Sequence, residues 1–502
     1  METKKLDLLL VSPAPIFRTI PLGIMSIASY VRARGFSVAI LVDNLWGLKK
    51  RLARLDLRNT VVGFSATTDV IDEAMALGDW LKSHLSAEIY CLVGGIHATV
   101  TPQETLAGSR FDCLVQGEGE ATVLEILERR AAGARPPYGI PGTWERDQQG
   151  EILSGPPRAL LPDLDELPFP AFDLVDFNLW KGGIRAGGVH LKRVATLLTS
   201  RGCPYQCVFC GSKSMWHRKI RAYSSRYCLE LMEELLERYH LDGFSFLDDE
   251  LVADKRRILD LCAEIKRRGL QEKIKWEAHS TATSANEEVF RVMKEAGCVN
   301  IRIGLESGSE KILRFLKKGQ ATVKKNYLAI TAARNAGLNV FGSFILGSPE
   351  ETVDDVLATI NFIKDSGLTG VAVFVAVPYP GTELFTICQE KGYFRPGLSY
   401  KDYVVEGPNV AAIIRNESFS AEQLEAIKKF INIHVVEPLN NCSKIPNLDY
   451  RAEIDKIRRG DMSGTEYPFS IKLKNTLIKF NRRIKTAIND PKMIIYYFSR
   501  RY

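Results

Sequence analysis

Three cysteines lie close together near the middle of this 502-residue chain, at Cys203, Cys207 and Cys210. Gaps of three and then two residues put the thiols on one tight loop, where thiolates can bind three irons of a cubane iron–sulfur cluster. The fourth iron then lacks a protein ligand, so it can bind a small molecule and pass an electron to it. The alternative is a zinc loop, but a structural zinc site needs four ligands, and neither a fourth cysteine nor a pair of histidines follows at the usual spacing.

The second half of the chain must position this loop. Its six short apolar runs are separated by helical patterns, so the repeating unit is a strand followed by a helix. We expect a partial (β/α)6 barrel, in which the chemistry gathers at the carboxyl ends of the strands. The expected strands are 193–200, 243–249, 274–280, 300–306, 340–347 and 371–378.

The first part of the chain also alternates strand and helix patterns, which predicts an α/β domain with a doubly wound parallel sheet. Its expected strands are 6–12, 37–43, 60–66, 89–95 and 113–119. Ligands of such sheets bind beyond the carboxyl ends of the strands. A glycine there often only makes the turn, but four loops with small or polar residues on one edge favour a ligand cleft. These residues are Ser12, Ser65, Gly94, Gly95, Gly117 and Glu118.

Length and composition indicate a soluble globular protein with more than one core, since 45% of the residues are hydrophobic and 25% are charged. We predict four regions. A doubly wound domain over 1–135 is followed by a Pro- and Gly-rich linker over 136–190 with one hairpin. The barrel follows over 191–395, and a helical C-terminal region covers 396–502.

The C-terminal tail carries most of the net charge of +7, because residues 470–502 contain nine Lys or Arg and one Asp. Five apolar residues there recur at helical spacing, at Leu473, Leu477, Phe480, Ile484 and Ile488. A basic amphipathic helix of this kind can lie on an anionic membrane surface, and a helix docked on the barrel is the alternative. We expect no nucleic-acid partner, because no RNA-binding module is recognisable outside this tail.

The expected location is the cytoplasm. No apolar run is long enough to cross a bilayer, and the first residues lack the apolar length of a secretory signal. Ten cysteines, three clustered and seven scattered, fit a reducing compartment better than a disulfide framework. The basic tail adds the expectation of peripheral contact with the inner face of the membrane.

The cysteine motif after the first strand of a partial barrel resembles the radical S-adenosylmethionine (SAM) superfamily. Further stretches match in order: Phe246-Leu247-Asp248-Asp249-Glu250, Gly304-Leu305-Glu306-Ser307-Gly308, and Val377-Pro378-Tyr379-Pro380-Gly381-Thr382. Between the last two, Ser343 to Glu350 is similar to the family's G-x-I-x-G-x-x-E, with Ser343 in place of the first Gly.

The resemblance implies a 4Fe-4S cluster on the three cysteines and SAM bound nearby. The implied SAM-binding residues are Phe209, Asp249, Glu306, Ser307, Ile345, Gly347, Glu350 and Val377. Among these, Asp249 and Glu350 taken singly are also explained as helix caps or solvated charges. Arg201, which precedes the cysteine loop, is equally well explained as a brace for the loop or as a residue that tunes the cluster.

A doubly wound domain ahead of such a barrel resembles the cobalamin-binding subgroup, the class B radical SAM methyltransferases. The supporting stretches are Pro21–Tyr30, Gly94–Thr99 and Gln116–Glu120, and the whole resemblance covers about residues 5 to 395. It implies cobalamin at Ser12, Ser65, Gly94, Gly95, His97, Gly117 and Glu118. The D-x-H-x-x-G element is absent, so we expect no protein imidazole on cobalt and a loop-structuring role for His97.

The resemblance implies that the reduced cluster cleaves SAM to a 5′-deoxyadenosyl radical, which removes hydrogen from an unactivated carbon that is then methylated. The expected substrate is a small molecule, including one from the membrane: a lipid, an isoprenoid or a tetrapyrrole-like compound. An external donor such as flavodoxin or ferredoxin would reduce the cluster. The alternatives are an oxidative cyclase or carbon–carbon bond-forming enzyme with a vestigial cobalamin domain, and an RNA-modifying enzyme.

Overall fold

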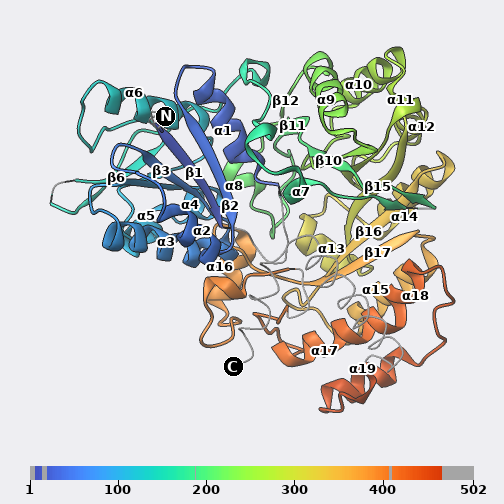
Figure 1. Ribbon diagram of the computed structural model, residues 1–502. Coiled ribbons are helices and arrows are strands. Elements are labelled where there is room, and N and C mark those ends of the chain that lie inside the picture. Colours follow the sequence, from blue (N-terminus) through green and yellow to red (C-terminus); the bar gives the residue numbers. More distant parts are fainter. Residues whose placement is uncertain (1–5, 14–19, 148, 187, 406–409, 466–502) are drawn as a thin grey trace.

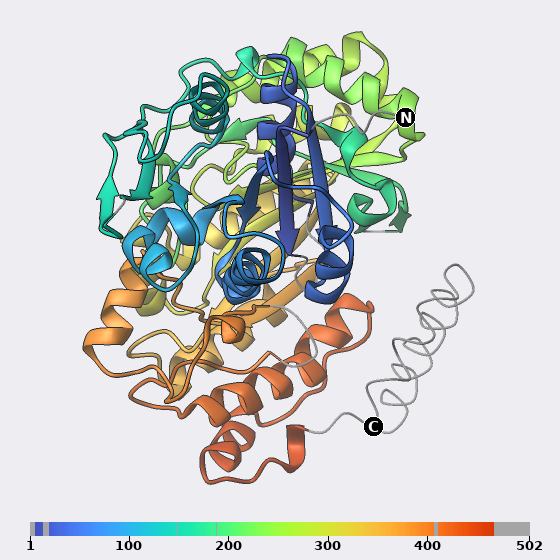
Figure 2. The ribbon, with the colours of Figure 1, turned by 60° about the vertical axis from the view of Figure 1, so that its left-hand side comes forward.

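The structure is a computed structural model that describes residues 6–13, 20–147, 149–186, 188–405 and 410–465 (Figure 1). Two sheets dominate these residues. Figures 1 and 2 agree that the N-terminal sheet, in blue, lies beside the barrel, in green to yellow. The C-terminal helices, in orange to red, pack against the last barrel strands.

The N-terminal sheet has the strand order β2-β1-β3-β4-β5-β6-β7. Its first five strands are parallel, which confirms the predicted doubly wound sheet. The direction in which the sheet grows changes at β1, because β2 lies on one side of it and β3 on the other. Ligands of doubly wound sheets bind at such a switch point, beyond the carboxyl ends of the strands. The strands are β1 (Leu8–Pro13), β2 (Val38–Asp43), β3 (Val61–Ser65), β4 (Tyr90–Gly94), β5 (Cys113–Val115), β6 (Thr143–Arg146) and β7 (Ile152–Ser154).

Helices cover both faces of this sheet because successive side chains of a strand point to opposite sides. On β1, Leu8 and Leu10 pack in the same core as α1 and α6, whereas Leu9 and Val11 pack in the core of α2, α3 and α5. The helices are α1 (Leu22–Arg32), α2 (Leu45–Leu52), α3 (Ile71–His84), α4 (Ile96–Val100), α5 (Pro102–Ala107) and α6 (Glu120–Ala131).

The segment predicted as a linker, 136–190, is packed rather than extended. Its predicted hairpin is formed by β6 and β7, which add antiparallel strands to the edge of the first sheet. Further along, Leu164, Leu167 and Phe172 are buried in a core that also contains barrel residues. The segment therefore fastens the two sheets together, and it ends in α7 (Phe177–Trp180) and the short pair β8 (Arg185–Ala186) and β9 (Val189–His190).

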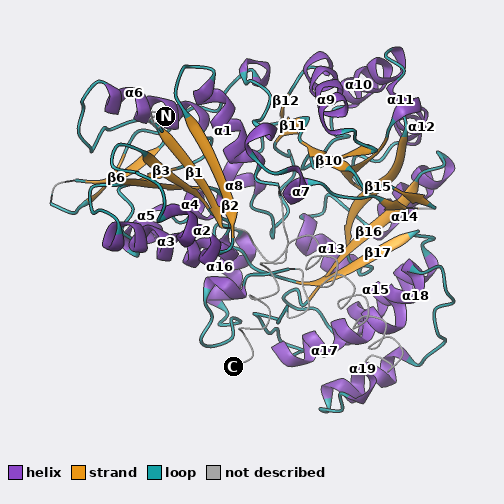
Figure 3. Ribbon diagram, viewed as in Figure 1, coloured by secondary structure: helices purple, strands orange, loops and turns teal. Residues whose placement is uncertain are grey.

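The second sheet confirms the predicted partial barrel. Six parallel strands follow the order of the chain, β10-β13-β14-β15-β16-β17, so β10 and β17 are its edges. They are β10 (Val194–Leu197), β13 (Gly243–Phe246), β14 (Lys275–Thr281), β15 (Cys298–Glu306), β16 (Asn339–Leu346) and β17 (Gly370–Val375). Figure 3 shows helices along the outside of this curved sheet.

Most of these outer helices alternate with the strands. They are α9 (Ser225–Tyr239), α10 (Lys255–Arg267), α11 (Leu270–Lys273), α12 (Glu287–Glu295), α13 (Glu310–Lys317), α14 (Val323–Asn335), α15 (Val353–Asp365) and α16 (Glu383–Glu390). Between β10 and α9 the chain forms β11 (Ser200–Arg201), α8 (Ser212–Trp216) and β12 (Arg221–Ala222).

Helices dominate the C-terminal region from Ala421 to the last described residues, after a stretch with little regular structure. A short 3-10 turn (Tyr400–Asp402) contacts the N-terminal domain, and three helices pack on β17 and α15: α17 (Ala421–Ile431), α18 (Glu437–Asn440) and α19 (Tyr450–Arg458). The predicted amphipathic tail at 470–502 lies outside the described residues. Among the helices that are described, none has the length and apolar character to cross a membrane.

Candidate functional site

The three cysteines lie on one loop, 202–220, whose ends are joined by the antiparallel pair β11 and β12. Gly202 makes this closure possible, because its φ is +101° and a Cβ there would lie 2.0 Å from the carbonyl oxygen of Lys219. All three thiols are free and partly buried. The backbone N–H of Ser212 donates to Cys210 Sγ at 3.5 Å, which is the kind of contact that stabilises a thiolate ligand.

The chemistry of this donor set fits a cluster. Burial raises the pKa of Cys203 to about 12 and that of Cys210 to about 11, so without iron these thiols hold their protons. Iron must displace those protons to bind. No group of three or more His, Cys, Asp or Glu within the described ranges is arranged to hold a metal ion. A cubane differs from a single ion, because each of the three thiolates binds a different iron.

A buried ion pair lies beside the loop. Glu306, at the carboxyl end of β15, pairs with Lys317 Nζ at 2.8 Å, and both side chains are 8% exposed. Glu306 adopts a φ of +61°, a strained conformation that turns the chain at the strand end. Burial lowers the pKa of Lys317, but the charge of Glu306 and the neighbouring Cys207 raise it more, so Lys317 stays a cation next to the cysteines.

Three predicted SAM-binding residues come together. Phe209, Ile345 and Val377 belong to one apolar cluster at the carboxyl ends of β16 and β17. The Lys317 ammonium lies 5.5 Å from the centre of the Phe209 ring. These contacts bring the cysteine loop, the end of β15, β16 and the segment after β17 to one place.

The acidic run after β13 supplies one residue that sequence reasoning did not single out. Asp249 accepts a hydrogen bond from the Ser212 hydroxyl at 2.6 Å, which ties it to the cysteine loop. Its neighbour Glu250 is buried, and burial raises its pKa to about 7. One Glu250 oxygen accepts from Ser280, while the other has no hydrogen-bond partner among the described residues. The sequence signal for Glu250 was its position at the end of the stretch from Phe246 to Glu250, which resembles a family motif.

Two of the predicted SAM-binding residues point away from the cysteine loop. The Glu350 side chain is 68% exposed at the surface, where its own N–H donates to Glu417. The next residue, Glu351, is fully buried and accepts from the Gly347 N–H at 2.5 Å, and burial raises its pKa to about 8. Ser307 is buried against α15, with its hydroxyl 3.1 Å from that of Thr359.

A cavity of about 270 Å³ lies between the N-terminal sheet and the cysteine loop. The loops after β3, β4 and β5 form one wall, and β11, α8 and α9 contribute to the other. Gly95 is needed there, because its φ is +103° and a Cβ would lie 2.6 Å from the carbonyl oxygen of Ala66. The lining residues predicted from the sequence are Ser65, Gly94, Gly95, Gly117 and Glu118.

Ser12 and His97 are not among the residues that line this cavity. Ser12 lies near the carboxyl end of β1. His97 is buried on α4, with Nδ1 3.2 Å from the Thr68 hydroxyl and its ring packed against Tyr400 at 4.5 Å between centres. Burial lowers the pKa of His97 to about 4. The loop-structuring role of His97 stays a prediction, and these contacts are compatible with it.

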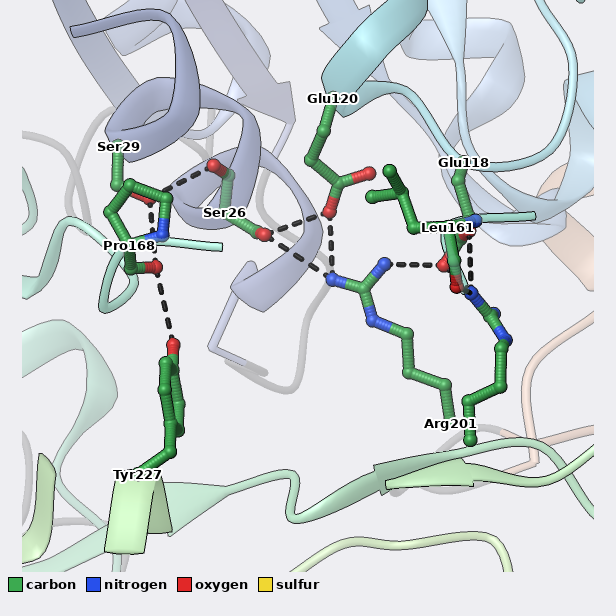
Figure 4. Close-up of polar contacts among 9 residues, drawn as sticks. Ser26, Ser29, Glu118, Glu120, Leu161, Pro168, Arg201 and Tyr227 are labelled. Atoms are coloured by element: carbon green, nitrogen blue, oxygen red, sulfur yellow. Dashed lines mark hydrogen bonds and ion pairs between the residues drawn. The ribbon is translucent and has the colours of Figure 1, made fainter. Parts of the chain in front are cut away.

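A network of buried charges joins the two walls of the cavity (Figure 4). Arg201 donates to Glu118 at 2.5 Å and to Glu120 at 2.7 Å. Ser26, on α1, also donates to Glu120, at 2.7 Å. Arg221, on β12, donates to both oxygens of Glu118 at 2.9 Å. The sequence had singled out Arg201 and Glu118 and had included Ser26 and Glu120 in the stretches that support the resemblance, but nothing local marks Arg221.

Comparisons with known proteins agree with this geometry. Residues 197–363 match the family model of the radical SAM superfamily, and residues 16–127 match that of the B12 binding domain. An uncharacterized methyltransferase of Pyrococcus horikoshii is 32% identical over 425 residues, which are 83% of this chain and 88% of the relative. Cytidylyl-2-hydroxyethylphosphonate methyltransferase of Streptomyces wedmorensis is 26% identical, over 82% of this chain and 88% of that protein.

The fold is also that of a solved structure. The radical enzyme OxsB, with aqua-cobalamin and SAM bound, superimposes with a TM-score of 0.69 at 17% identity, covering 95% of this chain and 76% of OxsB. The chain therefore belongs to the radical SAM superfamily, in the family of cobalamin-dependent methylases. Its cofactors are a 4Fe-4S cluster, SAM and cobalamin.

Proposed function

We propose that this protein transfers a methyl group to an unactivated carbon of a small-molecule substrate. The observation that carries the proposal is the wall that the cysteine loop contributes to the cavity: Arg201, on β11 just before the loop, and Trp216, on α8 after the three cysteines, line the cavity of the N-terminal domain. A substrate held at this wall is within reach of both sites. When bound, the cluster and SAM supply a carbon radical that removes a hydrogen atom, and cobalamin supplies the methyl group.

For SAM, we infer that Phe209, Ile345 and Val377 hold the adenine, because they form a single apolar surface beside the cysteines. Glu250 would accept from the methionyl ammonium, since it offers a buried carboxylate oxygen that has no partner in the described part of the chain. Glu306 would accept from the ribose hydroxyls, with its charge balanced by Lys317.

For cobalamin, we infer that the backbone of Ser65, Gly94, Gly95 and Gly117 forms the binding surface. Glycine at these strand ends lets the backbone approach a large flat ligand closely. His97 is engaged with Thr68 and Tyr400 instead, which supports cobalamin without a protein imidazole on cobalt.

For the substrate, we infer an apolar compound such as a lipid, an isoprenoid or a tetrapyrrole. The barrel side of the cavity supports this class, because Leu197, Leu198, Met215 and Trp216 line it. The external electron donor and the membrane contact of the C-terminal tail stay predictions.

The test uses SAM with a deuterated methyl group. Protein made with cobalamin, purified anaerobically and reconstituted with iron and sulfide is incubated with a low-potential reductant and with candidate compounds, both apolar and nucleotide-linked. Products are identified by mass spectrometry. We expect a deuterated methyl group on an apolar compound with the wild type and none with Cys203→Ala. Formation of 5′-deoxyadenosine with substrate consumed but no methyl gained would overturn methyl transfer in favour of ring closure.

A further inference from the structure

The base of the cysteine loop places two like charges opposite each other. β11 and β12 pair antiparallel, with Arg201 directly opposite Arg221. Like charges across a strand pair are unfavourable unless an opposite charge lies between them. The opposite charge here is Glu118: Arg201 donates to its Oε1 at 2.5 Å, and Arg221 donates to both of its oxygens at 2.9 Å. One carboxylate thus holds both ends of the loop that carries the cysteines.

Glu118 belongs to the other domain. It lies between Gly117 and Gly119 in the loop after β5, and all three residues line the cavity. Its side chain is 6% exposed, and those of Arg201 and Arg221 are 9% and 11% exposed. Burial opposes its ionisation, but the hydrogen bonds of Arg221 and the charge of Arg201 outweigh burial and hold the pKa of Glu118 below its ordinary value. The carboxylate is therefore charged at neutral pH.

A second carboxylate completes the balance of charge. Glu120 accepts from Arg201 and from Ser26, so two guanidinium groups face two carboxylates. Ser26 lies on α1 and Glu120 begins α6, and both residues line the cavity. The three network residues of the N-terminal domain, Ser26, Glu118 and Glu120, thus all belong to the cavity wall. A ligand that orders this wall therefore also orders the base of the cysteine loop.

We propose that Glu118 is a positioning residue that couples cobalamin binding in the cavity to the cluster loop. The proposal rests on the proposed use of this cavity for cobalamin. A cluster fixes Arg201 and Arg221 and, through them, Glu118 and the cavity wall, so cobalamin binds more tightly to cluster-loaded protein. By thermodynamic linkage, cobalamin makes the cluster harder to remove by the same factor.

The test compares hydroxocobalamin dissociation constants of cluster-loaded and cluster-free protein by equilibrium dialysis under anaerobic conditions. For the wild type we expect the cluster to tighten binding at least fivefold, which is the lower end of measured allosteric couplings. In Glu118→Gln, which keeps the size but not the charge, we expect the ratio to fall to about one. The matched control is Glu125→Gln, which weakens the ion pair between α6 and Arg158, away from the loop, and should keep the wild-type ratio.

A second measurement does not need cobalamin. The rate at which a chelator bleaches the cluster should rise several-fold in Glu118→Gln and stay unchanged in Glu125→Gln. If Glu118→Gln does not fold, Arg221→Gln takes its place in the test. In that variant Arg201 still donates to both Glu118 and Glu120, so the ratio of dissociation constants should fall only part of the way to one.

The outcomes separate the two proposals. A wild-type ratio near one, or the wild-type ratio retained in Glu118→Gln, would overturn the coupling even though cobalamin binds. If the wild type binds no cobalamin in either form, the use of the cavity for cobalamin is wrong. A bleaching rate that is unchanged in Glu118→Gln then also overturns the positioning role.

Discussion

Glu306 and Lys317 form an ion pair of 2.8 Å that is buried beside the cysteine loop. Lys317 is the last residue of α13, where a basic residue is ordinarily explained by the helix dipole, so its spacing in the sequence does not reveal this role. In the fold it is a cation that interacts with Cys207 and Cys210. Charge near a cluster is one of the factors that sets its reduction potential.

Replacing Lys317 by Met should make the reduction potential of the cluster more negative, because a cation favours the state that carries the extra electron. Redox titration followed by electron paramagnetic resonance measures this potential. The control is Lys324→Met, which removes an exposed cation on α14 and should leave the potential unchanged. An equal shift in both variants would show that only net charge matters. Lys317→Met should also lower the free energy of unfolding by about 3–5 kcal/mol, because it leaves Glu306 buried without its partner.

Cys203→Ala should abolish the cluster. The loop then offers two thiolates, and one iron of the cubane loses its protein ligand. Iron and acid-labile sulfide contents and the visible absorption of reconstituted protein measure the loss. Cys442→Ala is the matched control, because Cys442 is exposed and lies in the C-terminal region. Full iron content in Cys203→Ala would contradict the assignment.

Glu351 should make stability fall as pH rises. Burial raises its pKa from 4.5 in the unfolded chain to about 8, so the folded protein binds the extra proton. The stabilisation that this proton gives the folded state is complete below pH 4.5 and is lost as pH rises through 8. Between these values the free energy of unfolding falls by about 1.4 kcal/mol per pH unit. Denaturant unfolding should therefore show that the free energy of unfolding of Glu351→Gln rises relative to that of the wild type between pH 4.5 and 8, the window that these values set.

The neighbouring Glu350→Gln is the control for this pH effect. The Glu350 side chain is 68% exposed, so Glu350→Gln removes a neighbouring carboxylate without changing the buried one. The hypothesis fails if the stabilities of both variants depend on pH in the same way, because the two side chains differ in burial.

Gly95→Ala should weaken cobalamin binding at least tenfold, a loss of about 1.4 kcal/mol. An alanine Cβ would meet the Ala66 carbonyl at 2.6 Å and push the loop after β4 out of place. Gly133→Ala separates this clash from backbone strain, because Gly133 also has a positive φ, of +79°, but nothing within 4 Å of its Cβ. Equal cobalamin affinity in both variants would remove the loop from the binding surface.

The sheets and the cysteine loop could be predicted from the sequence because their signals are local. Alternating apolar runs and helical patterns gave both parallel sheets, and the spacing of Cys203, Cys207 and Cys210 marked the loop. The place of 136–190 was not visible, since whether a hairpin such as β6 and β7 joins a sheet depends on the distant edge of β5.

The side chains around the site were harder to predict. Spacing alone fits Glu350 to the family pattern, but a positive φ of +62° at Glu350 turns its side chain outward and leaves the interior to Glu351. Arg221 and Glu118 are 103 residues apart, and a contact of that separation leaves no periodicity to find.

The contact of Arg201 and Arg221 with Glu118 also bears on how the protein is made in the cell. A ribosome makes the N-terminal domain first, and domains tend to fold in that order. Glu118 precedes Arg201 by 83 residues, so its carboxylate belongs to a domain that can fold before the cysteine loop leaves the exit tunnel. The newly made loop would then close on a surface already in place, and iron delivery need only follow that closure. The order of the two domains along the gene therefore suits the order in which their cofactor sites are completed.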